Sequence, residues 1–419
     1  MSVKTMHITI VGYGTWGDVL PSLSLGLGLK KAGYGVRLMV TQDFEPWAGG
    51  RGVDIGAFSI DERKTMRDVS SRTHSLSVLT GIRRSVAPAL KSVGRQLAAV
   101  ADQTDVLIVN EWLLLAASGI AEAHKLRLIH MAQQPAVATA SIPIATVPPW
   151  PTWAPFGSVY NRLSYLAAHT ARWLAYAREQ NEFRRQDLEL LALSPIGFET
   201  LVRQTPSITM ISRHLVPRPP DWQSHHHLTG FVFYNNDQWE PPPALVEFLG
   251  SGPAPVYIGF GSMHDRRSER TTRQILDALA VSQQRAVLHR GWAGLGTMDL
   301  PDSVFPVDYI PHSWLFPRMA AIIHHAGAGT SAAALRSGVP SVPVPHSGDQ
   351  AFWANQLYLS GAATKPLARS KLRSDALASR IGLAVSNGEM RSHAAALGAV
   401  IRAEDGIAGA VAAIESILG

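Results

Sequence analysis

Short apolar runs that end near glycine alternate along the chain with longer stretches whose apolar residues recur at helical spacing. In the first half the strand-like runs are 7–12, 35–41, 105–109 and 126–131, and 19–32 is helix-like. Strands that alternate with helices are typical of a parallel sheet covered by helices on both faces. The first half is therefore predicted to be an α/β, Rossmann-like domain.

The same alternation restarts in the second half. Its predicted elements are strands at 256–262, 286–290, 308–310 and within 321–329, and an amphipathic helix at 268–283. The segment 216–245 between the halves is rich in proline and polar residues, as linkers are. We therefore predict a first domain at 1–215, a linker at 216–245 and a second domain at 246–405.

Composition agrees with two folded domains and narrows the function. The 419 residues are 46% hydrophobic and 17% charged, which fits a globular protein. There is no cysteine, so disulfides, thiolate metal sites and catalytic thiols are excluded. The net charge of +6 is scattered along the chain. This argues against a nucleic-acid partner and leaves peripheral membrane contact open.

The first residues lead into a strand-and-glycine pattern without the basic and apolar segments of a signal peptide. No clean apolar run reaches the roughly 20 residues that a membrane-spanning helix needs. We therefore expect a cytoplasmic protein without a transmembrane helix.

The segment 322–350 carries the clearest chemistry. An apolar strand leads through His325 into a glycine-rich turn, and an Ala-rich helix begins near Thr330. A helix amino end presents unpaired N–H groups and a favourable dipole to a phosphate, and Gly327 and Gly329 let the backbone approach it. His325 adds a side-chain donor. The alternative is a purely structural turn, because strand–glycine–helix junctions are common in α/β sheets.

Four motifs extend the argument to nearly the whole chain: 14–33, 255–263, 309–330 and 338–354. With these motifs the sequence resembles the inverting GT-B glycosyltransferases of family 1, especially the bacterial branch near sterol and glycopeptide-antibiotic glycosyltransferases. The resemblance implies a GT-B fold, in which two Rossmann-like domains face a central cleft. The first domain would bind the acceptor and the second the nucleotide-sugar donor, with a last helix at 406–419 packing back on the first domain.

The resemblance also assigns residues to donor binding. They are His325, Gly327, Ala328, Gly329 and Thr330 for the diphosphate, Ser262 for a further phosphate contact, Asp349 and Gln350 for sugar hydroxyls, and Trp292 and Tyr309 for the nucleotide base. A carboxylate and an amide together accept from and donate to a diol, which suits that task. Ser262 is alternatively a helix cap, and each aromatic ring is alternatively plain core.

Asp18, in the Gly-rich loop after the first strand, matches the position of the family's general base. As a base it would take the acceptor's proton while the hydroxyl displaces the diphosphate at the anomeric carbon, with inversion and no covalent intermediate. A carboxylate at a helix amino end is alternatively only a cap. Relatives near the sterol branch usually have Arg in place of Trp16 and Gly in place of Ala326. Trp16 is therefore a candidate acceptor contact beside the base.

The acceptor is expected to be an apolar molecule such as a sterol, a polyketide or another natural-product aglycone. This expectation rests on a Pro- and aromatic-rich stretch with Trp150, Trp153 and Phe156, which would line a site between 61–80 and 132–170. The donor is expected to carry a hexose on UDP or TDP, because the motifs do not distinguish these nucleotides.

No metal or other cofactor is expected. The sequence has no Asp-x-Asp motif, the divalent-metal clamp of the other common glycosyltransferase fold. The run from His225 to His227 lies in the Pro-rich linker and is interpreted as a solvated loop rather than a metal site.

Two other functions fit parts of the sequence. A non-catalytic nucleotide-sugar- or lipid-binding protein of the same fold would lose the base, whereas Asp18 is present. An NAD-linked oxidoreductase would use the glycines of 12–17, with Asp43 or Glu45 on the ribose. A dehydrogenase has no need of the segment 322–350. We therefore predict an inverting, metal-independent hexosyltransferase.

Overall fold

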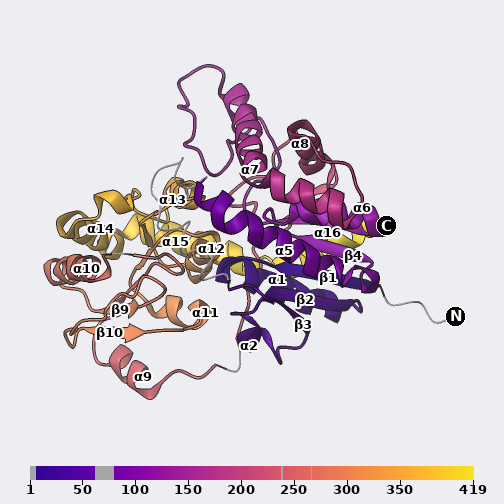
Figure 1. The fold of residues 1–419 in the computed structure, drawn as a ribbon. Helices are drawn as coiled ribbons and strands as arrows, with labels where there is room; N and C mark the ends of the chain where they lie inside the picture. The colour runs from indigo at the N-terminus through magenta and orange to yellow at the C-terminus, as the bar shows by residue number, and fades with distance from the viewer. Residues whose placement is uncertain (1–5, 62–79, 237–238, 266) are drawn as a thin grey trace. The chain divides into compact units, whose positions relative to one another are not determined.

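The computed structural model describes residues 6–61, 80–236, 239–265 and 267–419. The chain forms two compact units, each built on one parallel sheet (Figure 1). Unit 1 comprises Met1–Arg213, Pro217–Tyr234 and Asp405–Gly419, and unit 2 comprises His214–Val216 and Asn235–Glu404. The predicted α/β class with two parallel sheets is confirmed.

Unit 1 is built on a seven-stranded sheet in the order β3-β2-β1-β4-β5-β6-β7. Its strands are β1 His7–Gly12, β2 Gly35–Thr41, β3 Asp54–Phe58, β4 Val106–Val109, β5 Arg127–Ala132, β6 Ser207–Thr209 and β7 His226–Leu228. The central strands are continuous apolar runs because both faces of a parallel sheet are covered. In β4, Val106 and Ile108 face one side of the sheet, Leu107 and Val109 face the other, and all four are buried.

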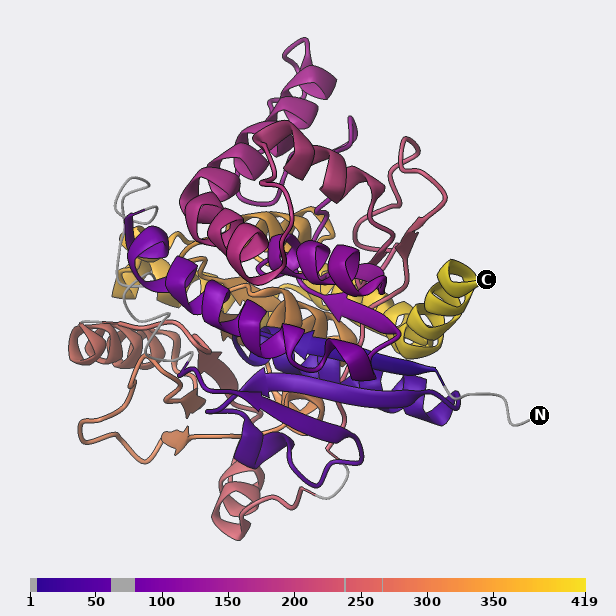
Figure 2. The ribbon, with the colours of Figure 1, turned by 45° about the vertical axis from the view of Figure 1, so that its right-hand side comes forward.

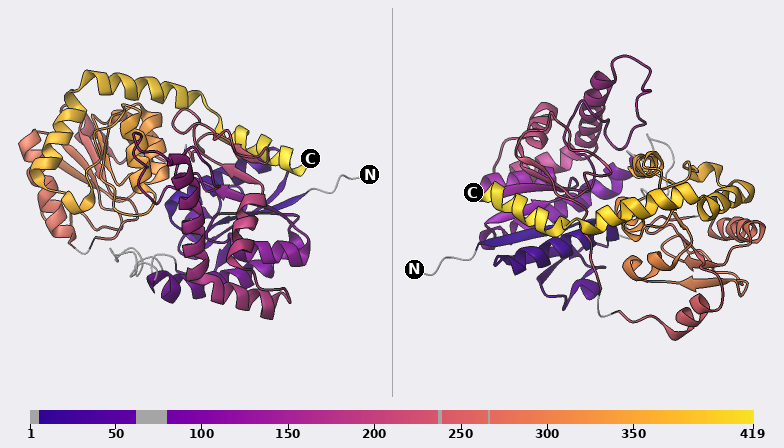
Figure 3. Two further views of the ribbon diagram at one scale, coloured as in Figure 1. Left: turned by 90° about the horizontal axis from the view of Figure 1, so that it is seen from above. Right: turned by 180° about the vertical axis from the view of Figure 1, so that it is seen from behind.

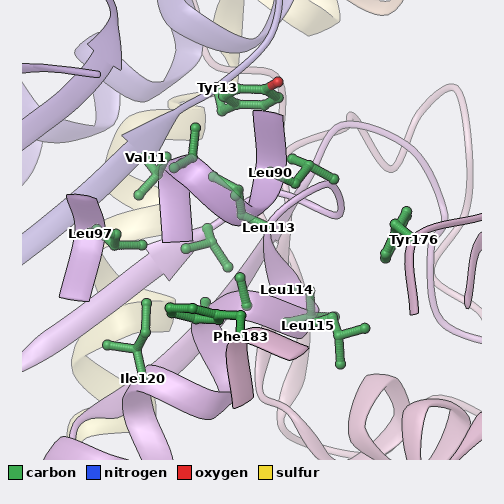
Figure 4. Close-up of a cluster of buried hydrophobic side chains, with 14 of the residues drawn as sticks. Val11, Tyr13, Leu90, Leu97, Leu113, Leu114, Leu115, Ile120, Tyr176 and Phe183 are labelled. Carbon is green, nitrogen blue, oxygen red and sulfur yellow. The ribbon is translucent and has the colours of Figure 1, made fainter. Parts of the chain in front are cut away.

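Helices cover both faces of this sheet. They are α1 Trp16–Lys31, α2 Glu45–Ala48, α5 Ala87–Ala98, α6 Leu114–His124, α7 Gly157–Asp187, α8 Pro195–Gln204 and α16 Gly406–Leu418, with a π-helical turn Ile82–Val86 and a 3-10 turn Ala101–Gln103. One face packs on α5, α6, α7 and α8, around residues such as Leu90 and Phe183 (Figure 4). The other packs on α1, α2 and α16, around Leu23 and Ile414.

The C-terminal helix α16 packs against α1 within unit 1 (Figure 3). Gly28 of α1 faces Ile407, and a Cβ at Gly28 would collide with that side chain. A Cβ at Gly406 or Gly409 of α16 would likewise collide with a backbone carbonyl oxygen in the segment that follows β7, that of Phe231 or Thr229. The close contact of the last helix therefore depends on glycine at these positions.

Unit 2 is built on a five-stranded sheet in the order β10-β9-β8-β11-β12. Its strands are β8 Val256–Gly259, β9 Ala286–His289, β10 Val304–Val307, β11 Ile322–His324 and β12 Ser341–Pro343. Its helices are α9 Pro243–Gly250, α10 Ser268–Ser282, α11 His312–Leu315, α12 Ala328–Ser337, α13 Gln350–Leu359, α14 Ser374–Ser386 and α15 Gly388–Ala403, with 3-10 turns Phe316–Arg318 and Arg369–Lys371. In β8, Val256 and Ile258 face the core of α10 and α14, and Tyr257 faces that of α9, α11 and α12.

One predicted strand of unit 2 was misplaced. The strand expected at 308–310 lies at Val304–Val307, and 308–310 follow it as irregular chain. Pro306 hides the strand in the sequence, since proline lacks the N–H that a central strand needs. β10 is an edge strand, where a missing N–H is tolerated. The next helix boundary was nearly right, because α12 begins at Ala328.

The histidine run at 225–227 is not the solvated loop that the sequence suggested. His226 is buried in β7, and its two ring nitrogens lie 2.9 Å from Oγ of Ser207 and 3.1 Å from the carbonyl oxygen of Arg203. Part of the segment 216–245, predicted as a linker, therefore belongs to the sheet of unit 1. A run of polar residues does not predict a buried strand. Here His226 can be buried because both of its ring nitrogens have hydrogen-bond partners inside the fold.

Helix α7 was not predicted. It follows the Pro-rich segment 133–156, and its first turns project from the rest of unit 1 (Figures 1 and 2). The helix has 31 residues but is rich in polar ones. Within the described parts of the chain, no helix combines the length and apolar character that crossing a bilayer requires.

Candidate active site

The carboxyl end of β11 leads directly into the amino end of α12. His324 ends the strand, and Gly327 occupies the N-cap position of the helix. Glycine has no side chain to cap the helix, and no side-chain cap is formed. Gly329 in the first turn is exposed, with open space beside its Cα. The first N–H groups of α12 are therefore available to an anion.

The imidazole of His325 lies against this turn. A Cβ at Gly261 would lie 2.8 Å from Cε1 of the ring, and one at Gly327 would lie 2.5 Å from Nε2. Among the described residues, Nδ1 of His325 has no hydrogen-bond partner although the side chain is buried. Burial and neighbouring histidines hold the pKa of His325 well below its usual value. The ring is therefore neutral at pH 7 and keeps one N–H for a ligand oxygen.

Ala326 has a left-handed backbone, with φ of +62°. A side chain in this conformation costs about 1 kcal/mol relative to glycine, so glycine would fit this position with less strain. The N–H of Ala326 donates to Nδ1 of His324 over 3.1 Å, and this hydrogen bond holds the turn in place. The substitution adds strain to the turn without removing a backbone donor.

Two further strand ends meet this turn, because β9, β8 and β11 are neighbours in one parallel sheet. Ser262 follows β8, in the turn whose Gly261 touches His325. The N–H of Trp292, after β9, donates to the carbonyl oxygen of Gly261 over 3.0 Å, and its ring lies 5.5 Å from that of His264. The structure therefore brings Ser262, Trp292 and His325 together at one edge of the sheet.

Asp349 and Gln350 lie where α13 begins, after β12. Oε1 of Gln350 accepts from the N–H of His346 over 2.8 Å, and Nε2 lies 3.2 Å from the sulfur of Met263. Oδ2 of Asp349 accepts from Nε1 of Trp353 over 2.9 Å. The pair lies beside the turn after β8 and already holds protein groups in place, so sugar binding by these side chains stays a prediction.

Tyr309 and Thr330 complete the predicted donor contacts. Tyr309 follows β10 and its side chain is exposed. The alternative that Tyr309 is a core residue is therefore wrong. Thr330 lies in the first turn of α12, after Ala328 and Gly329, and is partly exposed. All these positions lie at the carboxyl edge of the unit 2 sheet, where α/β folds bind ligands.

In unit 1, Asp18 is the third residue of α1 and forms a capping box with Thr15. Oδ2 of Asp18 accepts from the N–H of Thr15 over 2.9 Å, and the N–H of Gly17 donates to the Thr15 hydroxyl oxygen over 3.3 Å. A Cβ at Gly14 would lie 2.7 Å from Cγ of Asp18, so only glycine leaves room for the carboxylate. The capping role is therefore present, and it holds the carboxylate in one place.

Asn110 is a neighbour of Asp18 that the sequence analysis missed. Its Nδ2 donates to the carbonyl oxygen of Tyr13 over 2.6 Å and to Oδ1 of Asp18 over 3.3 Å. The contact arises because β1 and β4 are adjacent parallel strands, so that their carboxyl ends meet. The only sequence signal was a polar residue at the end of an apolar strand.

The next residue, Glu111, is the centre of a polar cluster beneath α7. The Glu111 cluster comprises Glu111, His130, Gln134, Tyr165, His169, Arg172 and Tyr176. Oε2 of Glu111 lies 2.8 Å from Nη2 of Arg172 and 3.3 Å from Nε2 of Gln134. Burial raises the pKa of Glu111, but opposing interactions, of which the charge of Arg172 is the largest, outweigh it and lower the pKa overall. The cluster therefore holds an ionised pair.

Several buried atoms of the Glu111 cluster lack a hydrogen-bond partner among the described residues. They are both ring nitrogens of His130, Oε1 of Gln134, Nε2 of His169 and the hydroxyl groups of Tyr165 and Tyr176. Burial also lowers the pKa of His130 to about 4, so its ring is neutral. A buried polar group without a partner costs about 1–3 kcal/mol, so water or a polar ligand group is expected here.

Trp16, predicted to contact the acceptor, packs in an aromatic cluster of unit 1. Its ring meets those of Phe44 and Trp47 edge to face, with 4.8 Å between ring centroids in both pairs. Arg51 lies over the Trp47 ring and donates to the hydroxyl of Tyr234 over 2.8 Å. Most of the Trp16 ring is therefore already covered by protein.

The other predicted acceptor residues lie near the surface of unit 1. Trp150 packs on Tyr160 and donates from Nε1 to a backbone carbonyl. Trp153 and Phe156 are 86% and 75% exposed. Of the predicted walls, 62–79 lie outside the described residues. Acceptor binding by these side chains stays a prediction.

Metal ligands are not gathered in the described ranges, where no three His, Asp or Glu side chains are placed to hold one ion. His312, His324 and His325 form a cluster of histidines. Burial is the main cause that lowers the pKa of each of them. Independence from metals and other cofactors stays a prediction.

Comparison with known proteins agrees with this geometry. The family model for the C-terminal domain of erythromycin biosynthesis protein CIII-like proteins matches residues 273–412. A sterol 3-beta-glucosyltransferase of Arabidopsis thaliana is 31% identical over 98% of this chain, which spans 65% of that relative's length. An O-mycaminosyltylonolide 6-deoxyallosyltransferase of Streptomyces fradiae is 30% identical over 98% of this chain and 97% of its own length.

A solved structure shows the same fold. The glycotransferase of kitacinnamycin matches with a TM-score of 0.73 over the full length of both chains, at 18% sequence identity. That identity supports the fold alone, whereas the Streptomyces relative covers nearly its whole length at 30% identity. The chain therefore belongs to the family 1 GT-B glycosyltransferases.

Proposed function

We propose that this protein is an inverting, metal-independent hexosyltransferase. It transfers a hexose from UDP or TDP to a hydroxyl of an apolar small molecule. The observation that carries the proposal is the uncapped amino end of α12 beside the neutral imidazole of His325. The names of two relatives, which act on a sterol and on a tylonolide, support sugar transfer to a natural product.

The donor diphosphate binds at the turn between β11 and α12. The first N–H groups of α12 and the N–H of His325 donate to phosphate oxygens, and Ser262 donates from the neighbouring turn. These donors lie in place before the reaction, so they stabilise the charge that develops on the leaving diphosphate without reorganising. The helix dipole supplies the positive character that a metal ion supplies elsewhere, which supports metal independence.

The acceptor hydroxyl is activated by Asp18. Its oxygen forms a bond to the anomeric carbon as the bond from that carbon to the phosphate oxygen breaks, and its proton passes to the carboxylate of Asp18. The electron pair of the broken bond leaves with the diphosphate. Thr15 holds Oδ2 of the carboxylate and Asn110 holds Oδ1, so both residues keep the proposed base in position.

The acceptor carries polar groups besides the hydroxyl that reacts. Glu111 of the Glu111 cluster is the residue after Asn110, whose side chain contacts Asp18, and we propose that the unpaired atoms of the cluster bind further polar groups of the acceptor. A monohydroxy sterol would leave those atoms without partners once its only polar group faces Asp18. An oxygenated aglycone such as a macrolactone would satisfy them, and buried groups that require a hydrogen bond discriminate strongly against ligands lacking it.

Release of free nucleoside diphosphate tests this proposal. UDP-glucose and TDP-glucose are supplied separately with EDTA, and each is combined with a monohydroxy sterol, an oxygenated macrolactone and a flavonoid. We expect acceptor-dependent release, greatest with an oxygenated acceptor and unaffected by EDTA. The variant Tyr176→Phe removes one unpaired hydroxyl. We expect it to reduce the ratio of nucleoside diphosphate release with the oxygenated acceptor to release with the monohydroxy acceptor.

Three results would change the proposal in different ways. Release that EDTA abolishes would contradict metal independence. Equal release with a sterol and a macrolactone would contradict the role of the Glu111 cluster. Binding of both donors without release from any acceptor would favour the non-catalytic binding protein.

A further inference from the structure

Along much of helix α7, polar side chains occupy buried positions while several large apolar side chains are exposed. Its inner face carries Asn161, Tyr165, His169, Arg172, Tyr176 and Gln180, all buried except Arg172, which is partly exposed. We define the outer stripe as Val159, Leu163, Leu166 and Leu174, which are between 47% and 60% exposed. At about 100° per residue these four lie within roughly 80° of the helix circumference.

Polar contacts fix the rotational setting of α7 together with the burial of Phe183 in the core. Arg172 pairs with Glu111 over 2.8 Å, and Arg184 pairs with Glu122 over 2.7 Å. Nδ1 of His169 lies 2.6 Å from a carboxylate oxygen of α8. Turning the helix to bury the outer stripe would break all three contacts, so the apolar side is held outward.

The outer stripe belongs to a larger concentration of exposed apolar side chains. Nine large hydrophobic residues of unit 1 are exposed within its described parts, and all nine lie between Trp150 and Ile196. The most exposed in the segment before α7 are Trp153 and Phe156, where the chain projects from unit 1 (Figure 2). An apolar surface of this kind marks an interaction site in a folded protein.

Charge on this surface indicates the partner. From residue 123 to residue 178 there is no Asp or Glu, and two exposed arginines, Arg162 and Arg178, lie on α7 itself. The side chains of Arg162 and Arg178 are 64% and 79% exposed, and their acidic partners Asp221 and Glu182 come from outside that stretch. Tryptophan, exposed aliphatic residues and arginine together suit the interface of a bilayer that contains anionic lipid.

We infer that the outer stripe of α7 and the preceding Trp153 and Phe156 dock unit 1 onto a phospholipid surface. The helix lies along the surface, with its apolar stripe among the acyl chains and its arginines at the headgroups. The inference goes beyond the proposed function, because it concerns where the protein meets its acceptor rather than which sugar it transfers. An apolar acceptor dissolved in the bilayer would be met there.

Vesicle flotation tests the inference and requires no turnover. Vesicles of phosphatidylcholine, alone or with about 30% phosphatidylglycerol, are mixed with the full-length protein. We expect the protein to float with both kinds and more strongly with the anionic ones. The variant Val159→Ser/Leu163→Gln/Leu166→Gln is expected to reduce the partition coefficient by about tenfold or more, because three anchoring side chains lose their apolar contact.

A matched variant in unit 2 provides the control. Val281→Ser/Leu359→Gln/Leu383→Gln makes the same changes at exposed apolar positions outside the proposed surface, and it should float like the parent protein. Equal thermal unfolding of both variants keeps the comparison valid, and single substitutions of the stripe replace the triple variant if it unfolds. Failure of the parent protein to float, or equal floating of the stripe variant, would overturn the inference. A parent dimer that the stripe variant dissociates would instead identify the surface as a contact between copies.

Discussion

The β1–α1 and β11–α12 junctions have the same plan and opposite chemistry. Both lead from a buried strand through glycines into a helix amino end. At α1 the end is closed, because Thr15 and Asp18 accept from its backbone and place a carboxylate there. At α12 the end is open, because Gly327 provides no cap and His325 adds a donor. The cap residue therefore decides which junction can receive a phosphate.

The difference also bears on the dinucleotide-binding alternative. In an NAD-binding protein of this fold, the pyrophosphate of the dinucleotide would bind at the amino end of α1. A carboxylate occupies that place and would repel an anion, so the first junction suits a proton acceptor and the second suits a diphosphate. Glycine spacing in a sequence is thus informative only together with the residue at the cap.

The largest effect is expected from Asp18→Asn. An amide at this position retains one oxygen for the cap but does not take a proton, so kcat should fall by about 10³-fold. Binding of the donor should remain unchanged, because the closed junction does not hold the diphosphate. Steady-state kinetics and donor titration of the same preparation measure both. Undiminished turnover would remove Asp18 from the mechanism.

A smaller loss is expected when the carboxylate is displaced rather than replaced. In Gly14→Ala the new methyl group collides with Asp18, and we expect kcat to fall by about 10–100-fold. Gly33→Ala is the matched control, because Gly33 also has a positive φ but has open space beside it. Gly33→Ala reports the cost of the positive φ alone, Gly14→Ala should lose more stability because it also disturbs the capping box, and only Gly14→Ala should lose activity. Equal activity in the two would show that the position of the carboxylate is not critical.

Acid should destabilise both units through their buried histidines. Burial lowers the pKa to about 4 for His130, His226 and His346, and to about 3 for His312 and His324. Between about pH 6.5 and these values the unfolded chain binds protons that the folded chain does not, so folding stability is lost as pH falls. Each histidine contributes a slope of up to about 1.4 kcal/mol per pH unit. Urea midpoints at pH 7, 6 and 5 measure it, and a flat series would contradict the buried neutral rings.

The smallest effect is expected at Ala326. Ala326→Gly relieves the left-handed alanine, and we expect the free energy of unfolding to rise by about 1 kcal/mol or less, since glycine also gains freedom in the unfolded chain. Denaturant unfolding measures the change, with Ala328→Gly in the helical region of the same segment as the control that should destabilise. A loss of stability in Ala326→Gly would show that the alanine is not strained.

Backbone features of this protein could be predicted from its sequence. The strand runs, the two junctions and the final helix follow apolar periodicity and glycine position, which are local. The spacing of Thr15 and Asp18 also indicates a capping box, although it does not indicate whether the carboxylate has a second role. Long-range side-chain contacts are different, because Asn110 reaches Asp18 only through strand pairing.

Helix α7 shows why the acceptor side of unit 1 was harder to predict. Sequence periodicity is interpreted on the assumption that apolar residues face the core. In α7 many buried positions are polar and four large apolar side chains are exposed, so that assumption assigns the wrong face to much of the helix. The polar side chains of the Glu111 cluster come from β5, from the segments that follow β4 and β5, and from α7, and they become neighbours only in the folded unit.

Donor titration of Gly329→Asp and Gly329→Asn tests most directly that the open junction binds the diphosphate. Gly329 is exposed and has space for either side chain, so the two variants differ mainly by one negative charge beside the first turn of α12. Calorimetry with UDP and with TDP in the presence of EDTA should show binding by the parent protein. We predict that Asp weakens it by at least about tenfold more than Asn while preserving thermal stability. Equal affinities in the two variants would place the diphosphate elsewhere and contradict the account.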